Sequence, residues 1–211
     1  KLKQVFHKPV MANISGFSLD EFVECCAKAD ASPHTDIIEV NVSCPNVHHG
    51  GMSFGTDPDM VHEVTRSVKA VCKKPVYVKL SPNVTDIVSI AKACEAGGAD
   101  GLSLINTLMG MRINIKKRAP ILANTTGGLS GPALFPVALR MVYQVYEAVN
   151  IPIIGMGGIA TAEDALEFIM AGATAVSVGT ANFFNPYATV EIAEGIEKFM
   201  AQQKVEDINQ L

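Results

Sequence analysis

The chain has 211 residues, of which 48% are hydrophobic and 18% are charged, and its formal net charge is −4. This composition supports a substantial core and argues against disorder. No basic stripe suggests nucleic-acid binding, Trp is absent, and no apolar run reaches the ~18 residues that a membrane helix needs.

Cysteine usage bears on the compartment of the protein. The five cysteines are an odd number without paired C-x-x-C spacing, at Cys25, Cys26, Cys44, Cys72 and Cys94. Without a signal peptide, this pattern favours a reducing cytoplasm over a disulfide framework. No acidic or cysteine cluster accompanies His48 and His49, so we expect no metal site. The start, Lys-Leu-Lys-Gln, has neither Met nor a targeting pattern, and we expect it to lie within a longer protein.

Short apolar runs alternate with helical patterns along the whole chain. Strands are predicted over 10–14, 37–42, 76–80, 101–105, 152–155 and 175–178. Helices are predicted over 19–29, 57–71, 85–96, 133–149, 161–171 and 190–202. Asp57 followed by Pro58 is a typical helix start, and Thr161 is a typical cap. A polar, Gly-rich excursion over 106–130 interrupts the alternation.

The near-continuous apolar strands are typical of a parallel sheet buried on both faces. No linker divides residues 1–211, so we expect a single domain. Six βα units fit an open doubly wound sheet, whereas a closed (β/α)8 TIM-type barrel needs eight. The Gly-rich loops after the last two strands favour the barrel, because barrels often bind phosphate after strands 7 and 8. We therefore predict an α/β barrel of which about six units are present and the first two are missing.

Glycines follow each of the last two predicted strands. Gly157 and Gly158 follow the first of these strands, and Gly179 with Thr180 follows the second. Glycines let backbone N–H groups approach an anion closely, and a helix N-terminus adds a favourable field. The alternative is that they only form tight turns, and the spacing does not fit the dinucleotide fingerprint. The pattern predicts a phosphate site.

The end of the predicted strand 37–42 carries two amides and a thiol. Asn41, Cys44 and Asn46 come where parallel strands usually present ligand-binding groups. A thiol can move a proton, and two amides can contact a planar, amide-rich ligand as donors and acceptors. Taken singly, a free cysteine is more often a small buried hydrophobe, and an asparagine there is more often a turn former. Their grouping favours a functional site.

Two further strand ends carry polar groups. Lys79 lies in an apolar strand, on the same face as Tyr77, and would offer a fixed positive charge if that face points inward. The alternative is a lysine that snorkels out to solvent. Asn106 and Thr107 follow the next strand, and the segment 126–132 reads as a flexible turn that either closes over a cofactor or is an ordinary loop. The other cysteines fall on predicted helices and are expected to be packing residues.

Taken together, these segments resemble dihydroorotate dehydrogenases. The segment 49–58 and Cys44 resemble the class 1B, NAD-linked group. The similar motifs are Asn41-Val-Ser-Cys44-Pro-Asn46, Lys79-Leu-Ser-Pro-Asn83, Ile105-Asn106-Thr107, Gly127-Gly-Leu-Ser-Gly131, Gly155-Met-Gly-Gly158 and Val178-Gly-Thr180.

The resemblance implies an FMN-binding (β/α)8 barrel that oxidises dihydroorotate to orotate in pyrimidine biosynthesis. Cys44 would take a proton from C5 while hydride leaves C6 for FMN N5. The pyrimidine would be held by Asn41, Asn46, Asn106 and Thr107. Lys79 would lie near the flavin N1–O2 edge and stabilise the reduced anion. The other FMN contacts implied are Ile105, Ser130, Gly131, Gly157, Gly158, Gly179 and Thr180.

The resemblance also implies partners. Class 1B enzymes pair with a subunit that carries FAD and an iron–sulfur cluster and passes electrons to NAD, and we expect a homodimer within a heterotetramer. Family members carry N-terminal segments with further flavin contacts and a substrate Lys and Asn, which do not occur in this sequence. The alternatives are a dihydropyrimidine dehydrogenase-like FMN domain and a catalytically inactive flavin-binding or interaction fragment.

Overall fold

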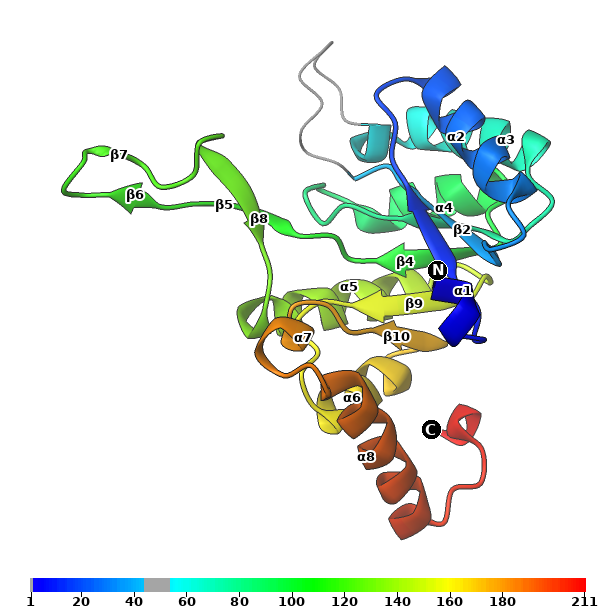
Figure 1. Cartoon of the computed structure of the whole chain (residues 1–211), viewed down its shortest axis with the longest axis vertical. Helices are drawn as coiled ribbons and strands as arrows, with labels where there is room; N and C mark the ends of the chain where they lie inside the picture. Colours follow the sequence, from blue (N-terminus) through cyan, green and yellow to red (C-terminus); the bar gives the residue numbers. More distant parts are fainter. Residues whose placement is uncertain (1, 44–53) are drawn as a thin grey trace.

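The computed structural model describes residues 2–43 and 54–211. Its centre is a curled sheet of six parallel strands in the order β1-β2-β3-β4-β9-β10 (Figure 1). These strands are β1 (Met11–Ile14), β2 (Ile37–Asn41), β3 (Val76–Lys79), β4 (Gly101–Leu104), β9 (Ile153–Met156) and β10 (Ala175–Ser177). All six predicted strands are therefore confirmed, with ends that differ by at most one residue.

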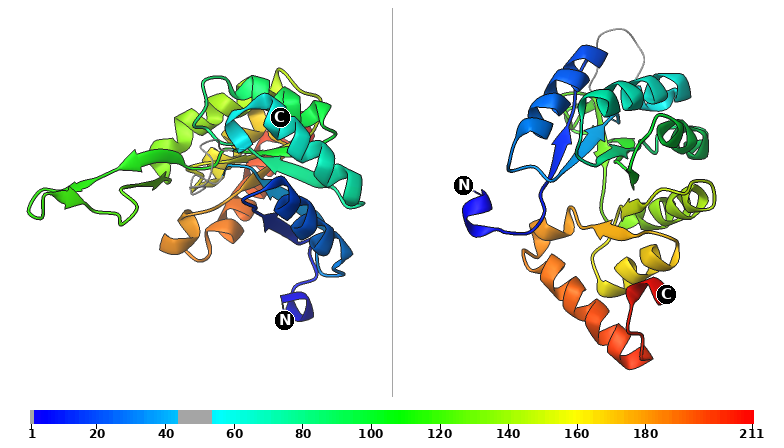
Figure 2. Two further views of the ribbon diagram at one scale, coloured as in Figure 1. Left: turned by 90° about the horizontal axis from the view of Figure 1, so that it is seen from above. Right: turned by 90° about the vertical axis from the view of Figure 1, so that its right-hand side faces the viewer.

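Helices follow the strands and line the outside of the curve (Figure 2). The larger ones are α2 (Leu19–Ala31), α3 (Pro58–Val71), α4 (Ile87–Ala96), α5 (Phe135–Tyr146), α6 (Ala162–Met170) and α8 (Ala188–Gln203). Short helical turns complete the chain as α1 (Leu2–Val5), η1 (Phe54–Thr56), η2 (Pro132–Leu134), α7 (Ala181–Phe184) and η3 (Ile208–Gln210). The alternation of strand and helix makes the fold α/β, as predicted.

The helix starts follow from their capping residues. The Asp57 carboxylate accepts hydrogen bonds from Asp59 N and Met60 N, and Pro58 occupies the first turn, where no N–H is needed. Thr161 and Asp164 form a reciprocal capping box at the start of α6. Both starts were predicted from the sequence, and they place α3 and α6 directly against the sheet.

The core lies between the sheet and its outer helices. Alternate strand residues such as Val40, Val78 and Leu102 point outward and are fully buried. The intervening residues face the inside of the curve, where Tyr77 and Lys79 are only half-buried. The expectation of a sheet buried on both faces therefore holds for β4, which is buried throughout, but not for β3 and β9, whose concave-face residues are only half-buried.

Within the described residues, the sheet remains open. β1 pairs only with β2, and β10 pairs only with β9, so each of them is an edge strand. A closed barrel of this type has eight strands. The six curled strands and their helices thus have the architecture of a partial TIM barrel.

The excursion over 106–130 forms an arm that extends away from the sheet (Figure 1). Its base pairs β5 (Leu108–Met111) antiparallel with β8 (Thr126–Leu129), and its tip pairs β6 (Ile113–Asn114) with β7 (Ala119–Pro120). The prediction of a flexible turn over 126–132 is therefore wrong for β8. Its glycines pair with an earlier strand, as in the pair Gly110 and Gly127, which lie 17 residues apart, and local turn propensity does not reveal such pairing.

Candidate active site

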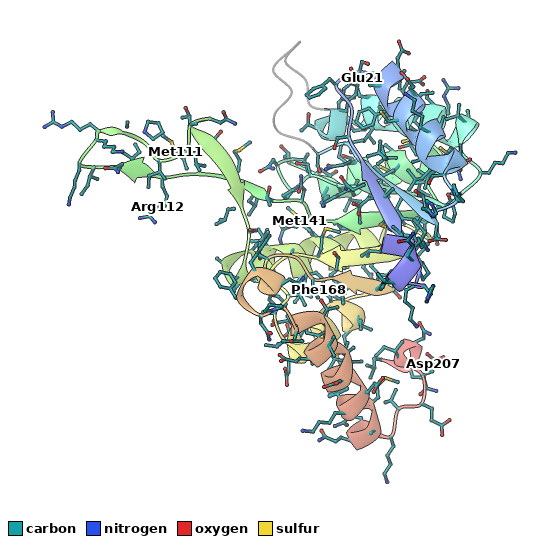
Figure 3. The ribbon with its side chains drawn as sticks, in the orientation of Figure 1. Glu21, Met111, Arg112, Met141, Phe168 and Asp207 are labelled. Carbon is teal, nitrogen blue, oxygen red and sulfur yellow. The ribbon has the colours of Figure 1, made fainter. Side chains whose placement is uncertain are left out.

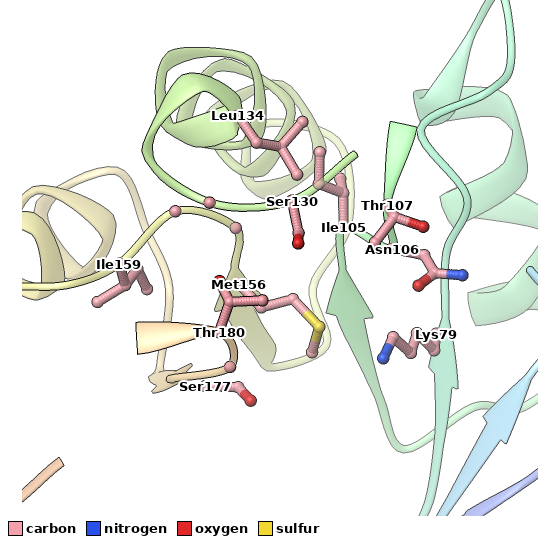
Figure 4. A pocket seen from close by; sticks show the side chains of 14 residues that line it. Lys79, Ile105, Asn106, Thr107, Ser130, Leu134, Met156, Ile159, Ser177 and Thr180 are labelled. Carbon is pink, nitrogen blue, oxygen red and sulfur yellow. The ribbon is translucent and has the colours of Figure 1, made fainter. Parts of the chain in front are cut away.

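A cavity of about 230 Å³ opens at the carboxyl ends of β3, β4, β9 and β10 (Figure 4). Ten of the predicted site residues line it. Six of them form a group with side chains, namely Lys79, Ile105, Asn106, Thr107, Ser130 and Thr180. The other four are the glycines Gly131, Gly157, Gly158 and Gly179. The strand ends thus bring together residues that lie up to about one hundred positions apart in the sequence, as expected for a parallel α/β fold.

Glycines form one wall of this cavity, and two of them are required by close backbone approach. A Cβ on Gly158, where φ is +80°, would lie 2.8 Å from the backbone N of Phe135. A Cβ on Gly157, where φ is +135°, would lie 2.6 Å from Cβ of Ala138. By contrast, a Cβ on Gly131 or Gly179 would meet nothing within 4 Å. The wall therefore leaves backbone open to the cavity, which fits the approach of a phosphate group.

The Lys79 side chain supplies the positive charge of the site. It is half-buried, and its ammonium group points into the cavity (Figure 4). Among residues 2–43 and 54–211 it forms no hydrogen bond or ion pair, although four other Lys and Arg side chains do form ion pairs. An unpaired cation in a concave polar site is available to a negatively charged ligand atom.

The amides lie on the other side of the site. Asn106 Nδ2 donates to the carbonyl of Ser43 at 3.1 Å. The Asn41 Oδ1 atom accepts hydrogen bonds from Ser43 N at 3.2 Å and from Ser43 Oγ at 2.6 Å. Asn41 is the register partner of Lys79, although it does not line the cavity itself. Both amides thus converge on Ser43, the last described residue before the predicted base.

Two predicted site residues cannot be placed. Cys44 and Asn46 lie outside the described residues, so their roles stay predictions. The remaining cysteines are free thiols, and Cys26 and Cys94 are fully buried. Burial raises the pKa of Cys26 and Cys94 to about 12, and that of Cys72 to about 11. These three thiols are therefore packing residues, as the sequence predicted.

Some residues of the site were missed. Leu134, Met156, Ile159 and Ser177 also line the cavity. Met156 and Ser177 could have been found from strand alternation, because they point to the same face as Lys79. A second cavity, of about 590 Å³, lies beside the first and shares Lys79, Met156 and Ser177 with it. It also contacts Glu39, a charged residue inside an apolar strand.

The described part of the chain contains no helix long and apolar enough to cross a membrane. It also contains no group of three or more His, Cys, Asp or Glu side chains arranged to bind a metal ion. The polar groups that line the 230 Å³ cavity are the Asn106 amide, the Lys79 ammonium group, exposed backbone, and the hydroxyl groups of Thr107, Ser130, Ser177 and Thr180.

Comparisons with known proteins identify the family of this chain. The sequence model of the family described as dihydroorotate dehydrogenase matches residues 1–200. The chain is 59% identical over 207 residues to a protein of Alkaliphilus metalliredigens named dihydroorotate dehydrogenase B (NAD(+)), catalytic subunit, covering 98% of this chain and 68% of that protein. A protein of the same name from Enterococcus faecalis is 54% identical over 211 residues, which cover 100% of this chain and 68% of the relative. The chain thus spans about two thirds of the length of these relatives.

The fold also matches a solved structure. A crystal structure of DHODH from Eimeria tenella in complex with ferulenol superposes with a TM-score of 0.75 at 23% sequence identity. The match covers 91% of this chain and 56% of that chain. With the family match over almost the whole sequence, these comparisons show that the chain belongs to the dihydroorotate dehydrogenase family.

Proposed function

We propose that this chain supplies the flavin site and much of the substrate site of an FMN-dependent dihydroorotate dehydrogenase B catalytic subunit. The reaction is the oxidation of dihydroorotate to orotate, a step of pyrimidine biosynthesis. The observation that carries the proposal is the single cavity lined by ten residues expected to bind flavin and substrate. The names of the relatives, at 54% to 59% identity, support the NAD-linked class.

FMN fits the residues that are present. The backbone at Gly131 and Gly179 is open to the cavity and suits the phosphate, with Gly157, Gly158 and Thr180 beside it. Ile105 and Ser130 would contact the flavin, and unpaired Lys79 would stabilise negative charge on the reduced ring. When bound, FMN accepts the hydride that leaves C6 of dihydroorotate.

The amides and the thiol would act on the substrate. Among the described residues, Asn106 uses only its Nδ2 atom, on Ser43, and keeps its oxygen for a ligand. Asn41 uses its oxygen on Ser43 and one Nδ2 hydrogen in a long contact to Asn13, which leaves the second Nδ2 hydrogen for a ligand. Together with Asn46 and Thr107 they would hold the pyrimidine. Cys44 follows Ser43 directly, and its thiolate would take the C5 proton.

The open sheet supports a proposal about the complete barrel. β10 and β1 are the two edge strands, and the strands between them in the sheet carry polar side chains on the concave face. We propose that two further βα units stand between β10 and β1 in the functional protein, as the first two of eight. Such units would pair both edges and cover the open side of the flavin site.

The arm supports the expected assembly. Its exposed apolar side chains include Met111, which lies far from the core residue Phe168 (Figure 3). The others are Met109, Ile113, Ile115, Ile121, Leu122 and Leu129. An apolar protrusion of this kind suits contact between subunits. We propose a homodimer within a heterotetramer whose other subunit carries FAD and an iron–sulfur cluster, in the cytoplasm.

The test is anaerobic reduction of the flavin in the full-length protein. Dihydroorotate should bleach the flavin absorbance of the wild type. Cys44→Ser should retain flavin but reduce it far more slowly at pH 7, since a serine hydroxyl ionises much less readily than a thiol of pKa ~8.5. Dihydrouracil serves as the second substrate, because faster bleaching by it would favour a dihydropyrimidine dehydrogenase-like domain.

Three outcomes would contradict the proposal. A full-length protein that binds no FMN would refute the flavin site. A protein that binds FMN but is reduced by neither substrate would favour an inactive flavin-binding or interaction module. Undiminished reduction of the Cys44→Ser variant at pH 7 would remove Cys44 from the reaction but leave the flavin site in place.

A further inference from the structure

A buried carboxylate lies on the concave face of the sheet, where the proposed reaction gives it no role. Glu39 is only 6% exposed, although it belongs to the apolar strand β2. One of its carboxylate oxygens accepts a hydrogen bond from Ser103 Oγ on β4, at 2.5 Å. The other accepts a hydrogen bond from Asn13 Nδ2 on β1. Glu39 therefore connects three strands, and no cation lies within ion-pair distance of it among the described residues.

The hydrogen bonds continue from Asn13 towards the predicted substrate amides. Asn41 Nδ2 donates to Asn13 Oδ1 through a long contact of 3.5 Å. Asn41 Oδ1 in turn accepts from Ser43, whose carbonyl accepts from Asn106 Nδ2. The result is a continuous chain of hydrogen bonds from Glu39, in the middle of β2, to both amides at the carboxyl edge of the sheet.

The chain has a direction, and Glu39 sets it. An ionised carboxylate can only accept hydrogen bonds, whereas an asparagine amide can turn either its oxygen or its nitrogen to a neighbour. Because Glu39 takes the Asn13 nitrogen, the Asn13 oxygen must face Asn41. This oxygen then holds the Asn41 nitrogen, while Ser43 holds the Asn41 oxygen. Without the carboxylate, Asn13 is free to turn its nitrogen towards that of Asn41, which places donor against donor.

We propose that Glu39 is a positioning residue that, through Asn13, fixes the side-chain orientation of Asn41 and so the pattern of donors offered to the pyrimidine. This inference rests on the proposed role of Asn41 as a substrate ligand. The simpler reading is that Glu39 only stabilises the fold by bonding Ser103 and Asn13. The two readings differ in what happens when each partner of Glu39 is removed alone.

The experiment measures orotate affinity in full-length, FMN-saturated protein by the change in flavin absorbance. Glu39→Met keeps the side-chain length but removes the acceptor, and it should weaken orotate binding roughly tenfold, about the worth of one hydrogen bond. Asn13→Ala breaks the same chain at an exposed residue and should weaken binding to a similar extent. This second variant keeps the test valid if Glu39→Met does not fold.

Ser103→Ala is the matched control. It removes the other partner of Glu39, a fully buried hydroxyl, but leaves the contact between Glu39 and Asn13 intact. It should lower the unfolding midpoint and change orotate affinity less than twofold. The inference is overturned if Ser103→Ala weakens binding as much as Glu39→Met does, or if folded Glu39→Met and Asn13→Ala proteins bind orotate as the wild type does.

A second measurement separates this inference from the proposed function. In protein labelled with 15N-asparagine, the side-chain amide signal of Asn41 should shift and exchange faster with solvent in Glu39→Met than in the wild type or Ser103→Ala. If the wild type binds no orotate but Glu39→Met still shows this change, the proposed substrate is refuted and the positioning of Asn41 is not. An unchanged Asn41 signal would overturn the inference whatever the substrate proves to be.

Discussion

The two halves of the sheet present their functional groups in different ways. At the ends of β2, β3 and β4, the functional groups belong to side chains, because Asn41, Lys79 and Asn106 carry the amides and the charge. At the ends of β9 and β10, backbone groups face the cavity at Gly157 and Gly179, which have no side chain. Lys79 and Asn106 from the first half line the same cavity as Gly157 and Gly179 from the second. Substitutions in the first half should therefore change the charge and hydrogen bonding of the cavity, whereas substitutions in the second half should change the shape of its wall.

Adding a methyl group to the glycine wall should have the largest effect. Gly158→Ala forces a residue with φ of +80° to carry a Cβ, 2.8 Å from a backbone nitrogen of Phe135. Backbone strain and overpacking should together cost about 2–5 kcal/mol of unfolding free energy. Chemical denaturation should show this loss, and FMN binding should be lost with it.

Gly179→Ala is the control within the same wall, since its Cβ would meet no atom within 4 Å. The unfolding free energy should change by less than about 0.5 kcal/mol. FMN affinity should still fall, because the methyl group would enter the space left for the phosphate. If Gly158→Ala folds and binds FMN as the wild type does, the backbone wall is not required by close approach, and the contrast between the halves is broken.

In the first half of the sheet, removing the charge of Lys79 should have an intermediate effect on FMN binding and on the flavin midpoint potential. Lys79→Met keeps the apolar stem but removes the ammonium group, which has no described partner whose loss would destabilise the fold. The flavin midpoint potential should fall, because the reduced anion loses its neighbouring cation. FMN binding should weaken about ten- to a hundredfold, the value of a hydrogen bond to a charged group. Spectroelectrochemistry and fluorescence titration measure the two quantities.

Lys79→Arg keeps the positive charge and should leave the midpoint potential nearer to that of the wild type. The unfolding midpoints of both variants should stay close to the wild-type value. An unchanged potential in Lys79→Met would place the ammonium group away from the flavin and would contradict its proposed role beside the flavin N1–O2 edge. A large loss of stability instead would show that the lysine has a structural role that its contacts do not reveal.

The same contrast explains what the sequence could predict. Strands were predictable because apolar alternation, as around Val76 and Val78, is a pattern of a few neighbouring residues. Helix starts were predictable because the caps Asp57 and Thr161 bond to backbone groups within a few residues of themselves. The strand-end residues of the cavity were predictable because parallel strands share one edge, so that Lys79 and Gly179 meet without any local signal for their contact.

Long-range pairing could not be predicted in the same way. The bonds from Glu39 to Asn13 and Ser103 depend on the register of three strands, and residue spacing alone does not reveal that register. The arm escaped prediction because β8 contains Gly127 and Gly128, which usually indicate a turn. Gly128 instead packs so closely on Thr107 that an added Cβ would lie 2.2 Å from its Oγ1 atom.

The smallest expected effect is the labelling of the helix cysteines in the first half by a thiol reagent. Their labelling rates test whether reactive groups in this half are confined to the strand ends. In a Cys44→Ser background at pH 8, a thiol whose pKa is raised to about 12, as for Cys26 and Cys94, is ionised in roughly one molecule in ten thousand. Burial also blocks access, so folded protein should label these two thiols very slowly. Because the thiolate is the reactive form, the labelling rate should rise about tenfold per pH unit below those pKa values.

Half-exposed Cys25 is the internal control and should label first. Mass spectrometry of peptides would locate the label, and labelling of Cys94 as fast as that of Cys25 would show that α4 opens readily and that reactive thiols are not restricted to the strand ends.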